Sequence, residues 1–232
     1  MRITAGTLIG AGWQVLKRQW GLLAVAALLV AFVQAGQRVL DGYGTNQPLT
    51  KALPMLLLVT LLGAVLQYAI HAIVARRVLL REGLAQPGVA PRYGHFVLVN
   101  LLITPAVLLG ALLLIVPGIL LLLRWFLASA FTLTRGMNAL DALAASREAT
   151  RGHRGAMLGA LLAMAAIWLV PYVLLIIGAG GFLAISTTPI FGAVGLVRLA
   201  LTGLAGSLSL ALGVGVFGEL SHDKDPLSEV FA

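Results

Sequence analysis

Arginines are the side chains of this chain best suited to bind a ligand. Arg124 interrupts a long apolar stretch, and Arg198 interrupts another nearer the C-terminus. Three more fall on one face of a helix when the helical period is applied, namely Arg147, Arg151 and Arg154. A guanidinium is a planar fork of donors that matches the oxygens of a phosphate group. These five arginines are therefore the candidate contacts to lipid phosphate.

Arg124 has three interpretations. A charge inside an apolar span is by default a functional hypothesis, and no Asp or Glu lies within any predicted span, so its partner would be a backbone carbonyl, water or a lipid phosphate. Alternatively, its stem reaches the outer interface, about 9 Å from a hairpin at Pro117 and Gly118 at 1.5 Å per residue. A transport role is the third interpretation. Arg198 has the same alternatives, and reaching the interface is favoured because it lies nearer the outer end of its span.

The segment 138–152 has the pattern of an amphipathic helix. Asn138 can cap its first turn, and Asp141 places a negative charge near the positive end of the backbone dipole. One face begins apolar and becomes basic, which is typical of a helix that rests on an anionic membrane surface. An equal alternative is that the arginines only set the topology, or pair with Asp141 and Glu148.

No pattern of residues in the sequence predicts catalysis or metal binding. The chain has no cysteine, and none of its four histidines has another histidine or a carboxylate at ligand spacing. No phosphate-binding glycine loop or nucleophile elbow is present. We therefore expect a protein that is not an enzyme and that holds no metal and no cofactor. An intramembrane enzyme ranks last among the functions considered.

Composition predicts that all these residues belong to an all-α integral membrane protein. Of 232 residues, 60% are hydrophobic and only 10% are charged. Soluble domains have roughly 45–50% apolar and about 25% charged residues, so polar surface is too scarce here to cover a water-soluble globule. The net charge of +8 does not indicate nucleic-acid binding, because the basic residues lie at the ends of apolar stretches.

The apolar stretches and their breaks predict about six membrane spans and two interfacial helices in one domain. The domain covers residues 1–232, with spans near 21–37, 52–75, 95–116, 119–134, 155–177 and 190–218 and interfacial helices at 4–20 and 138–152. Pro117 and Gly118 are expected to form a tight hairpin between the third and fourth spans. For the N-terminal segment, a signal peptide cleaved before Gly36 is the alternative.

Small residues recur at four-residue spacing in the sixth span. They are Gly203, Ser207, Ala211 and Gly215. Such a stripe lets two helices approach closely, so it predicts a helix-packing face. Ser207 has no base beside it in the sequence, which argues against a nucleophile.

The distribution of Lys and Arg predicts the orientation of the spans. Only Arg38 and Lys51 flank the spans on one side, whereas the other side carries the remaining basic residues outside the spans. Because cytoplasmic loops are enriched in Lys and Arg, the basic side is expected to be cytoplasmic, with both termini on it.

The central region resembles a known family. The resemblance rests on Met1 to Ala5, Ile115 to Ile119, Arg124-Trp125, Ala142-Leu143, Ser146, Thr150 to Gly152 and Arg154. In these residues the chain resembles the YciC-type uncharacterised bacterial inner-membrane proteins and the related membrane domain attached to some glycerophosphodiester phosphodiesterases. It departs from them at Arg135, near which the family often has an acidic residue, and at 145–147, where a basic–Ser–aromatic run is common.

The resemblance implies a multi-pass protein of the bacterial inner membrane, and the phosphodiesterase activity of some relatives is not expected of this chain. Together with the arginines, it predicts a non-enzymatic, lipid-interacting or envelope-organising function, with anionic membrane lipids as partners. The alternative is a small-solute transporter or channel component. A second copy of the chain or another membrane protein remains open as a partner, and nucleic acid is not expected.

Overall fold

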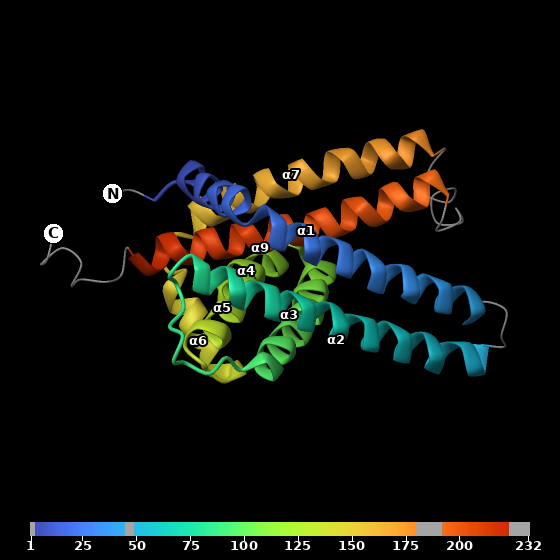
Figure 1. Ribbon diagram of the computed structural model, residues 1–232, viewed down its shortest axis with the longest axis horizontal. Coiled ribbons are helices and arrows are strands. Elements are labelled where there is room, and N and C mark those ends of the chain that lie inside the picture. Colours follow the sequence, from blue (N-terminus) through green and yellow to red (C-terminus); the bar gives the residue numbers. More distant parts are fainter. Residues whose placement is uncertain (1–2, 45–48, 180–191, 223–232) are drawn as a thin grey trace, which may run out of the picture.

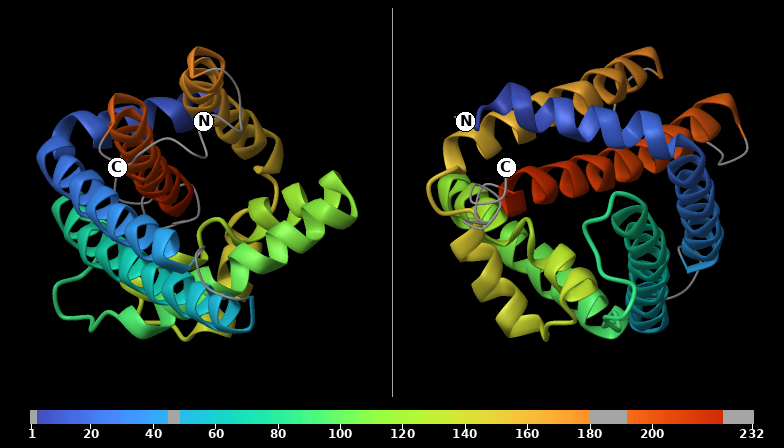
Figure 2. Two further views of the ribbon diagram at one scale, coloured as in Figure 1. Left: turned by 90° about the vertical axis from the view of Figure 1, so that its right-hand side faces the viewer. Right: turned by 60° about the vertical axis from the view of Figure 1, so that its left-hand side comes forward.

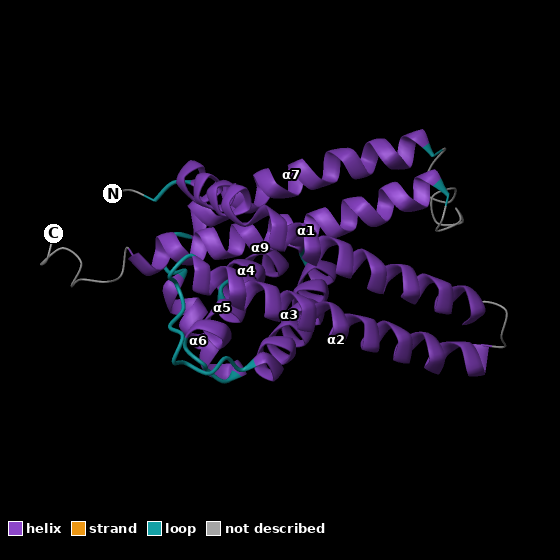
Figure 3. Ribbon diagram, in the orientation of Figure 1, coloured by secondary structure: helices purple, strands orange, loops and turns teal. Residues whose placement is uncertain are grey.

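The computed structural model describes residues 3–44, 49–179 and 192–222, and every regular element in them is a helix (Figures 1 and 3). The helices are α1 (Ala5–Gly44), α2 (Leu49–Arg81), α3 (Tyr93–Leu113), α4 (Ile115–Trp125), α5 (Ala128–Thr134), α6 (Ala139–Ala149), α7 (Arg154–Gly178) and α9 (Ala193–His222). Six stretches of the described residues are long and apolar enough to cross a membrane. The predicted all-α architecture with about six candidate spans is confirmed.

Three long helices, α2, α7 and α9, and the part of α1 that follows its kink at Gln19 run along the longest axis of the molecule (Figure 1). α1 packs mainly against α9 and α2, and α7 lies beside α1 and α9. Only 6% of the most apolar window of α2, and the same share of α7, is buried inside the protein. Because most residues of these two apolar windows are not buried against other described helices, their outward faces are the surfaces that lipid would cover.

The small residues of the sixth span lie where α9 meets α1. A Cβ added at Gly203 would meet the carbonyl of Ala27, and one at Gly215 would overlap the backbone of α1 at Gly12. Ser207 is buried and its hydroxyl donates to the carbonyl of Leu23 at 2.7 Å. Ala211 lies on the same stripe, with 2% of its surface exposed. The two backbones are therefore close enough that only small side chains fit between them.

The predicted boundary between the N-terminal helix and the first span lies beside a kink in α1, where two helical segments meet. The helix is kinked at Gln19, whose backbone leaves the helical region at φ −112° and ψ 17°, one residue before the predicted boundary. The side chain of Gln19 donates to Glu82 at 2.8 Å, and Arg18 donates to the same carboxylate at 3.2 Å. These contacts fix the kink to the end of α2. The helix continues through Arg38, where a loop was predicted, as far as Gly44.

The turn between α3 and α4 is at Leu114, so the prediction of a hairpin turn at Pro117 and Gly118 is wrong. Leu114 has extended backbone at φ −157° and ψ 130°, and α4 begins directly after it. Pro117 lies in the first turn of α4, where proline is tolerated because the missing N–H has no partner within the helix. Gly118 instead allows close packing, since a Cβ there would meet the backbone of Ala111 in α3.

The α3–α4 hairpin does not run parallel to the long helices. Its tip lies well short of the right-hand ends of α1, α2, α7 and α9 in Figure 1, and it projects sideways from them in Figure 2. The predicted fourth span, 119–134, is broken into α4 and α5 between Trp125 and Ala128. The break is stabilised from another helix: the hydroxyl of Ser146 in α6 accepts from the backbone N–H of Leu127 at 3.1 Å and donates to the carbonyl of Arg124 at 2.8 Å.

A buried arginine joins α2 to the loop that follows it and to α5. Arg76 has 4% of its surface exposed. Its guanidinium donates to the carbonyls of Leu133 at 2.7 Å, of Gln86 at 2.8 Å and of Val89 at 2.8 Å. One side chain therefore satisfies three backbone acceptors from two separate segments.

The remaining boundaries differ from prediction by several residues. α2 and α7 extend beyond the predicted spans 52–75 and 155–177. α3 begins and ends a few residues earlier than the predicted span 95–116, and α6 ends before the predicted residue 152. Asn138 caps α6 as predicted, because its side-chain oxygen accepts from the N–H of Asp141 at 2.9 Å. The predicted sixth span, 190–218, corresponds to α9, and its first two residues lie outside the described part of the chain.

Candidate anion site where α4 and α6 end and α7 begins

Four of the five predicted arginines come together around one cavity. The cavity has a volume of about 490 Å³, within the range of small-ligand sites. It is lined by Arg124, Ala144, Arg147, Glu148, Arg151 and Arg154. We call this set the arginine pocket. Since Arg124 precedes the others by more than twenty residues in the sequence, tertiary packing rather than helical spacing brings it to them.

Each arginine of the pocket is placed by a different local feature. Arg124 lies in the last turn of α4 and Arg147 in the last turn of α6, whereas Arg154 is the first residue of α7. The turn between α6 and α7 carries Arg151 and reverses at Gly152, whose φ of +94° is a conformation that favours glycine. The chain therefore reverses direction after α6, which brings Arg154 at the start of α7 close to Arg124 and Arg147.

Ser146 holds α6 against the C-terminal end of α4, and so fixes the position of Arg147 relative to Arg124. It is fully buried, and its hydroxyl bonds both sides of the α4–α5 break, including the carbonyl of Arg124 itself. Arg147 is the next residue, so the same contact that closes the break places Arg147 beside Arg124. Thr150 is also fully buried and donates to the carbonyl of Arg147 at 3.3 Å.

The pocket carries more positive than negative charge. Among its lining residues Glu148 is the single acid, and its carboxylate lies 4.0 Å from Arg151, with both side chains largely exposed. The Nε atoms of Arg124 and Arg154 are buried and have no hydrogen-bond partner among the described residues. Guanidinium groups held together without an equal number of carboxylates repel one another, and a bound anion would relieve that repulsion.

Arg124 lies at the end of α4 away from the turn at Leu114, whereas the sequence placed it about 9 Å from a turn at Pro117. α4 has only 11 residues, or about 16 Å at 1.5 Å per residue, and it returns from the hairpin tip toward α6. The side chain of Arg124 consequently lines a cavity with arginines that were predicted on the cytoplasmic side. The predicted distance was too short because it was counted from Pro117, which is not the turn.

The structure separates Arg198 from the other four arginines. Arg198 is buried in the second turn of α9, which begins at the opposite end of the molecule from α6 (Figure 1). It does not line the arginine pocket. Its burial between long helices fits a packing role rather than a contact shared with Arg124.

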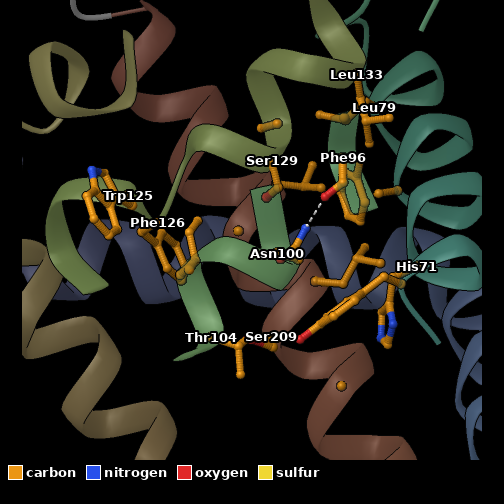
Figure 4. Close-up of a pocket in the computed structure, with 18 of the residues that line it drawn as sticks. His71, Leu79, Phe96, Asn100, Thr104, Trp125, Phe126, Ser129, Leu133 and Ser209 are labelled. Carbon is orange, nitrogen blue, oxygen red and sulfur yellow. Dashed lines mark hydrogen bonds between the residues drawn. The ribbon is translucent and has the colours of Figure 1, made fainter. Parts of the chain in front are cut away.

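A second cavity, which the sequence did not predict, lies between α2, α3, α9 and the α4–α5 break (Figure 4). Its volume is about 370 Å³, and no Asp, Glu, Lys or Arg is among the residues that line it. Tyr68 and Thr104 share a hydrogen bond of 2.8 Å there, and Nδ1 of His71 lies 2.9 Å from the carbonyl of Gln67. A mainly apolar wall with a few polar groups suits an uncharged molecule and not an ion.

The described residues contain no group of three or more His, Asp or Glu side chains that could hold a metal ion. Comparison with protein-family models, with characterised proteins and with solved structures gave no match.

Proposed function

We propose that this chain is a non-enzymatic, multi-pass protein of a bacterial inner membrane that binds anionic phospholipid of the cytoplasmic leaflet in the arginine pocket. The observation that carries the proposal is the convergence of four guanidinium groups from α4, α6, the following turn and α7 around one cavity. Guanidinium forks match phosphate oxygens, and basic pockets between membrane helices on the cytoplasmic side suit lipid head groups.

The proposed orientation follows from the positive-inside rule. The helix ends near the pocket carry Arg76, Arg77 and Arg81 of α2 in addition to the pocket itself, and the resemblance to inner-membrane proteins supports the same placement. A lipid held there would link α4, α6 and α7, and this is how the chain would influence the organisation of the envelope.

The topology has its own test. Reporter fusions after Gly44 and Gly178 are expected to read as exported, and fusions after Gly88 and His222 as cytoplasmic, because the basic residues are concentrated on the second side. Paired alkaline phosphatase and fluorescent-protein reporters give the measurement. An exported reporter after Gly88 would contradict the proposed orientation.

The lipid-binding function is tested by removing charge from the pocket. Near an anionic leaflet each arginine contributes on the order of 1 kcal/mol, so replacing Arg147, Arg151 and Arg154 with Gln is expected to weaken anionic-lipid binding roughly 100-fold at low salt. Native mass spectrometry of the full chain with defined lipids measures the retention. The effect should shrink as ionic strength rises.

A matched control removes the same charge elsewhere. Arg77, Arg92 and Arg135 are exposed and do not line the pocket, so their triple replacement with Gln changes net charge equally. We expect this control to retain anionic lipid. If the two triple variants retain equal amounts, the pocket arginines act only in topology, and the proposal is wrong.

A small-solute transporter is the second candidate, favoured by the uncharged 370 Å³ cavity between α2, α3 and α9. It predicts uptake of an uncharged solute by vesicles containing the chain. Replacing Gly206, which lines this cavity, with Leu should block that uptake without changing anionic-lipid retention.

A further inference from the structure

We infer that the arginine pocket prefers a phosphate monoester, which carries two negative charges, over the singly charged phosphodiester of common anionic lipids. The inference rests on the proposed function, because it names the head-group class that this pocket would select. Four arginines and one glutamate line the cavity, which leaves a formal charge of three positive units for a ligand to balance. A phosphodiester would balance one of these units and a dianionic monoester two.

The arrangement of the hydrogen-bond donors also favours a phosphate monoester over a phosphodiester. The guanidinium groups belong to α4, α6, the following turn and α7, so they approach a ligand from more than one helix. A phosphodiester has two unesterified oxygens, whereas a monoester has three strong acceptor oxygens. A terminal phosphate can therefore accept from more of these forks at once, and each charge-assisted bond is stronger than a neutral one.

Zwitterionic head groups fit the pocket poorly. Their ammonium group would enter a site that already carries excess positive charge, and Glu148, the one acid in the lining, already lies beside Arg151. The exposed position of Arg147 and Arg151 leaves the mouth of the pocket accessible to a head group.

A monoester gives the binding a characteristic pH dependence. Its second proton leaves near pH 6, so its charge approaches two between pH 5.5 and 7.5, whereas a phosphodiester keeps one charge throughout. The titratable protein groups at the pocket are Glu148 in its lining and His153, which precedes Arg154, and they are the same whichever anionic lipid is bound. Their effect therefore cancels in the ratio of monoester to phosphodiester binding. A rise of this ratio with pH reports the ligand and not the protein.

The test uses the full chain in nanodiscs of phosphatidylcholine that contain either phosphatidate or phosphatidylglycerol. One added charge near the arginines contributes on the order of 1 kcal/mol, so the ratio of phosphatidate to phosphatidylglycerol binding should rise about fivefold between pH 5.5 and 7.5. In Arg124→Gln the rise should be smaller, and in Arg77→Gln, which alters an exposed arginine outside the pocket, it should be unchanged. Unchanged thermal stability of both variants shows that the fold survives.

The outcomes separate the inference from the proposed function. Equal binding of both anionic lipids at both pH values, above that of phosphatidylcholine, overturns the monoester preference and leaves anionic-lipid binding in place. Binding of neither above phosphatidylcholine overturns both. Competition by free glycerol 3-phosphate distinguishes the source: weak competition identifies a membrane lipid, and displacement at equal concentration identifies a soluble monoester of the same chemistry.

Discussion

Replacing Arg76 with methionine is expected to be among the most destabilising single substitutions in the chain. Arg76 is buried and donates to three backbone carbonyls, at Leu133, Gln86 and Val89. Methionine fills much of the same volume but donates nothing, so acceptors are left without a partner at about 1–3 kcal/mol each. We expect a loss on the order of 3–5 kcal/mol and a fall of roughly 10 °C in the apparent melting temperature of the purified protein.

The next residue provides a matched control. Arg77 is exposed, so Arg77→Met removes the same charge from the same side and should change stability by less than about 0.5 kcal/mol. Limited trypsin digestion adds a local measurement, because Arg76→Met should release the 82–92 loop and speed cleavage after Arg92. Equal melting temperatures for the two variants would show that the three hydrogen bonds contribute no net stability.

Replacing Gly215 with alanine is expected to separate α9 from α1. A Cβ at this position would overlap the α1 backbone at Gly12, and backbone cannot move aside as a flexible side chain can. Overpacking of this kind costs about 1–3 kcal/mol, which corresponds to a fall of roughly 5–10 °C in melting temperature at the upper end of that range.

Gly213, two residues earlier on α9, distinguishes packing from helix propensity. A Cβ there would have no heavy atom within 4 Å, so Gly213→Ala should stabilise the helix by up to about 1 kcal/mol. Melting temperatures that move in opposite directions would support the close contact between α1 and α9. A rise for both variants would contradict it.

The features that the sequence predicted are those governed by local rules. Six apolar stretches were expected because a bilayer requires about 20 apolar residues per crossing, and six are found. The cap of α6 at Asn138 depends only on residues three positions apart, and the hydrogen bond to Asp141 is present. The stripe on α9 was likewise visible as a four-residue repeat, from Gly203 to Gly215.

The errors arose where a local signal had more than one physical meaning. Pro117 and Gly118 can make a turn, but proline also begins helices and glycine also permits close packing, which are the roles they have in α4. The break between α4 and α5 was not predictable from nearby residues. The group that satisfies its backbone, the hydroxyl of Ser146, belongs to α6.

In the candidate site, too, local rules predicted some of the residues, and only tertiary packing accounts for the others. Helical spacing grouped Arg147, Arg151 and Arg154, and they do line one cavity. Arg124 joins them only because α4 is short and is fixed to α6 through Ser146. Arg198, grouped with them by residue type, lies in α9 outside the pocket. The uncharged cavity between α2, α3 and α9 gave no signal, since its walls come from helices distant in the sequence.

The packing of α1 against α9 has a consequence for synthesis of the chain. The contact of Ser207 with Leu23 joins residues 184 positions apart. At about 5–20 residues per second, a ribosome needs on the order of ten to forty seconds to add that much chain. During that interval the first helix is in place while the helix that covers its close-packed face does not yet exist. Lipid, the insertion machinery or a chaperone must occupy that face until the last helix arrives.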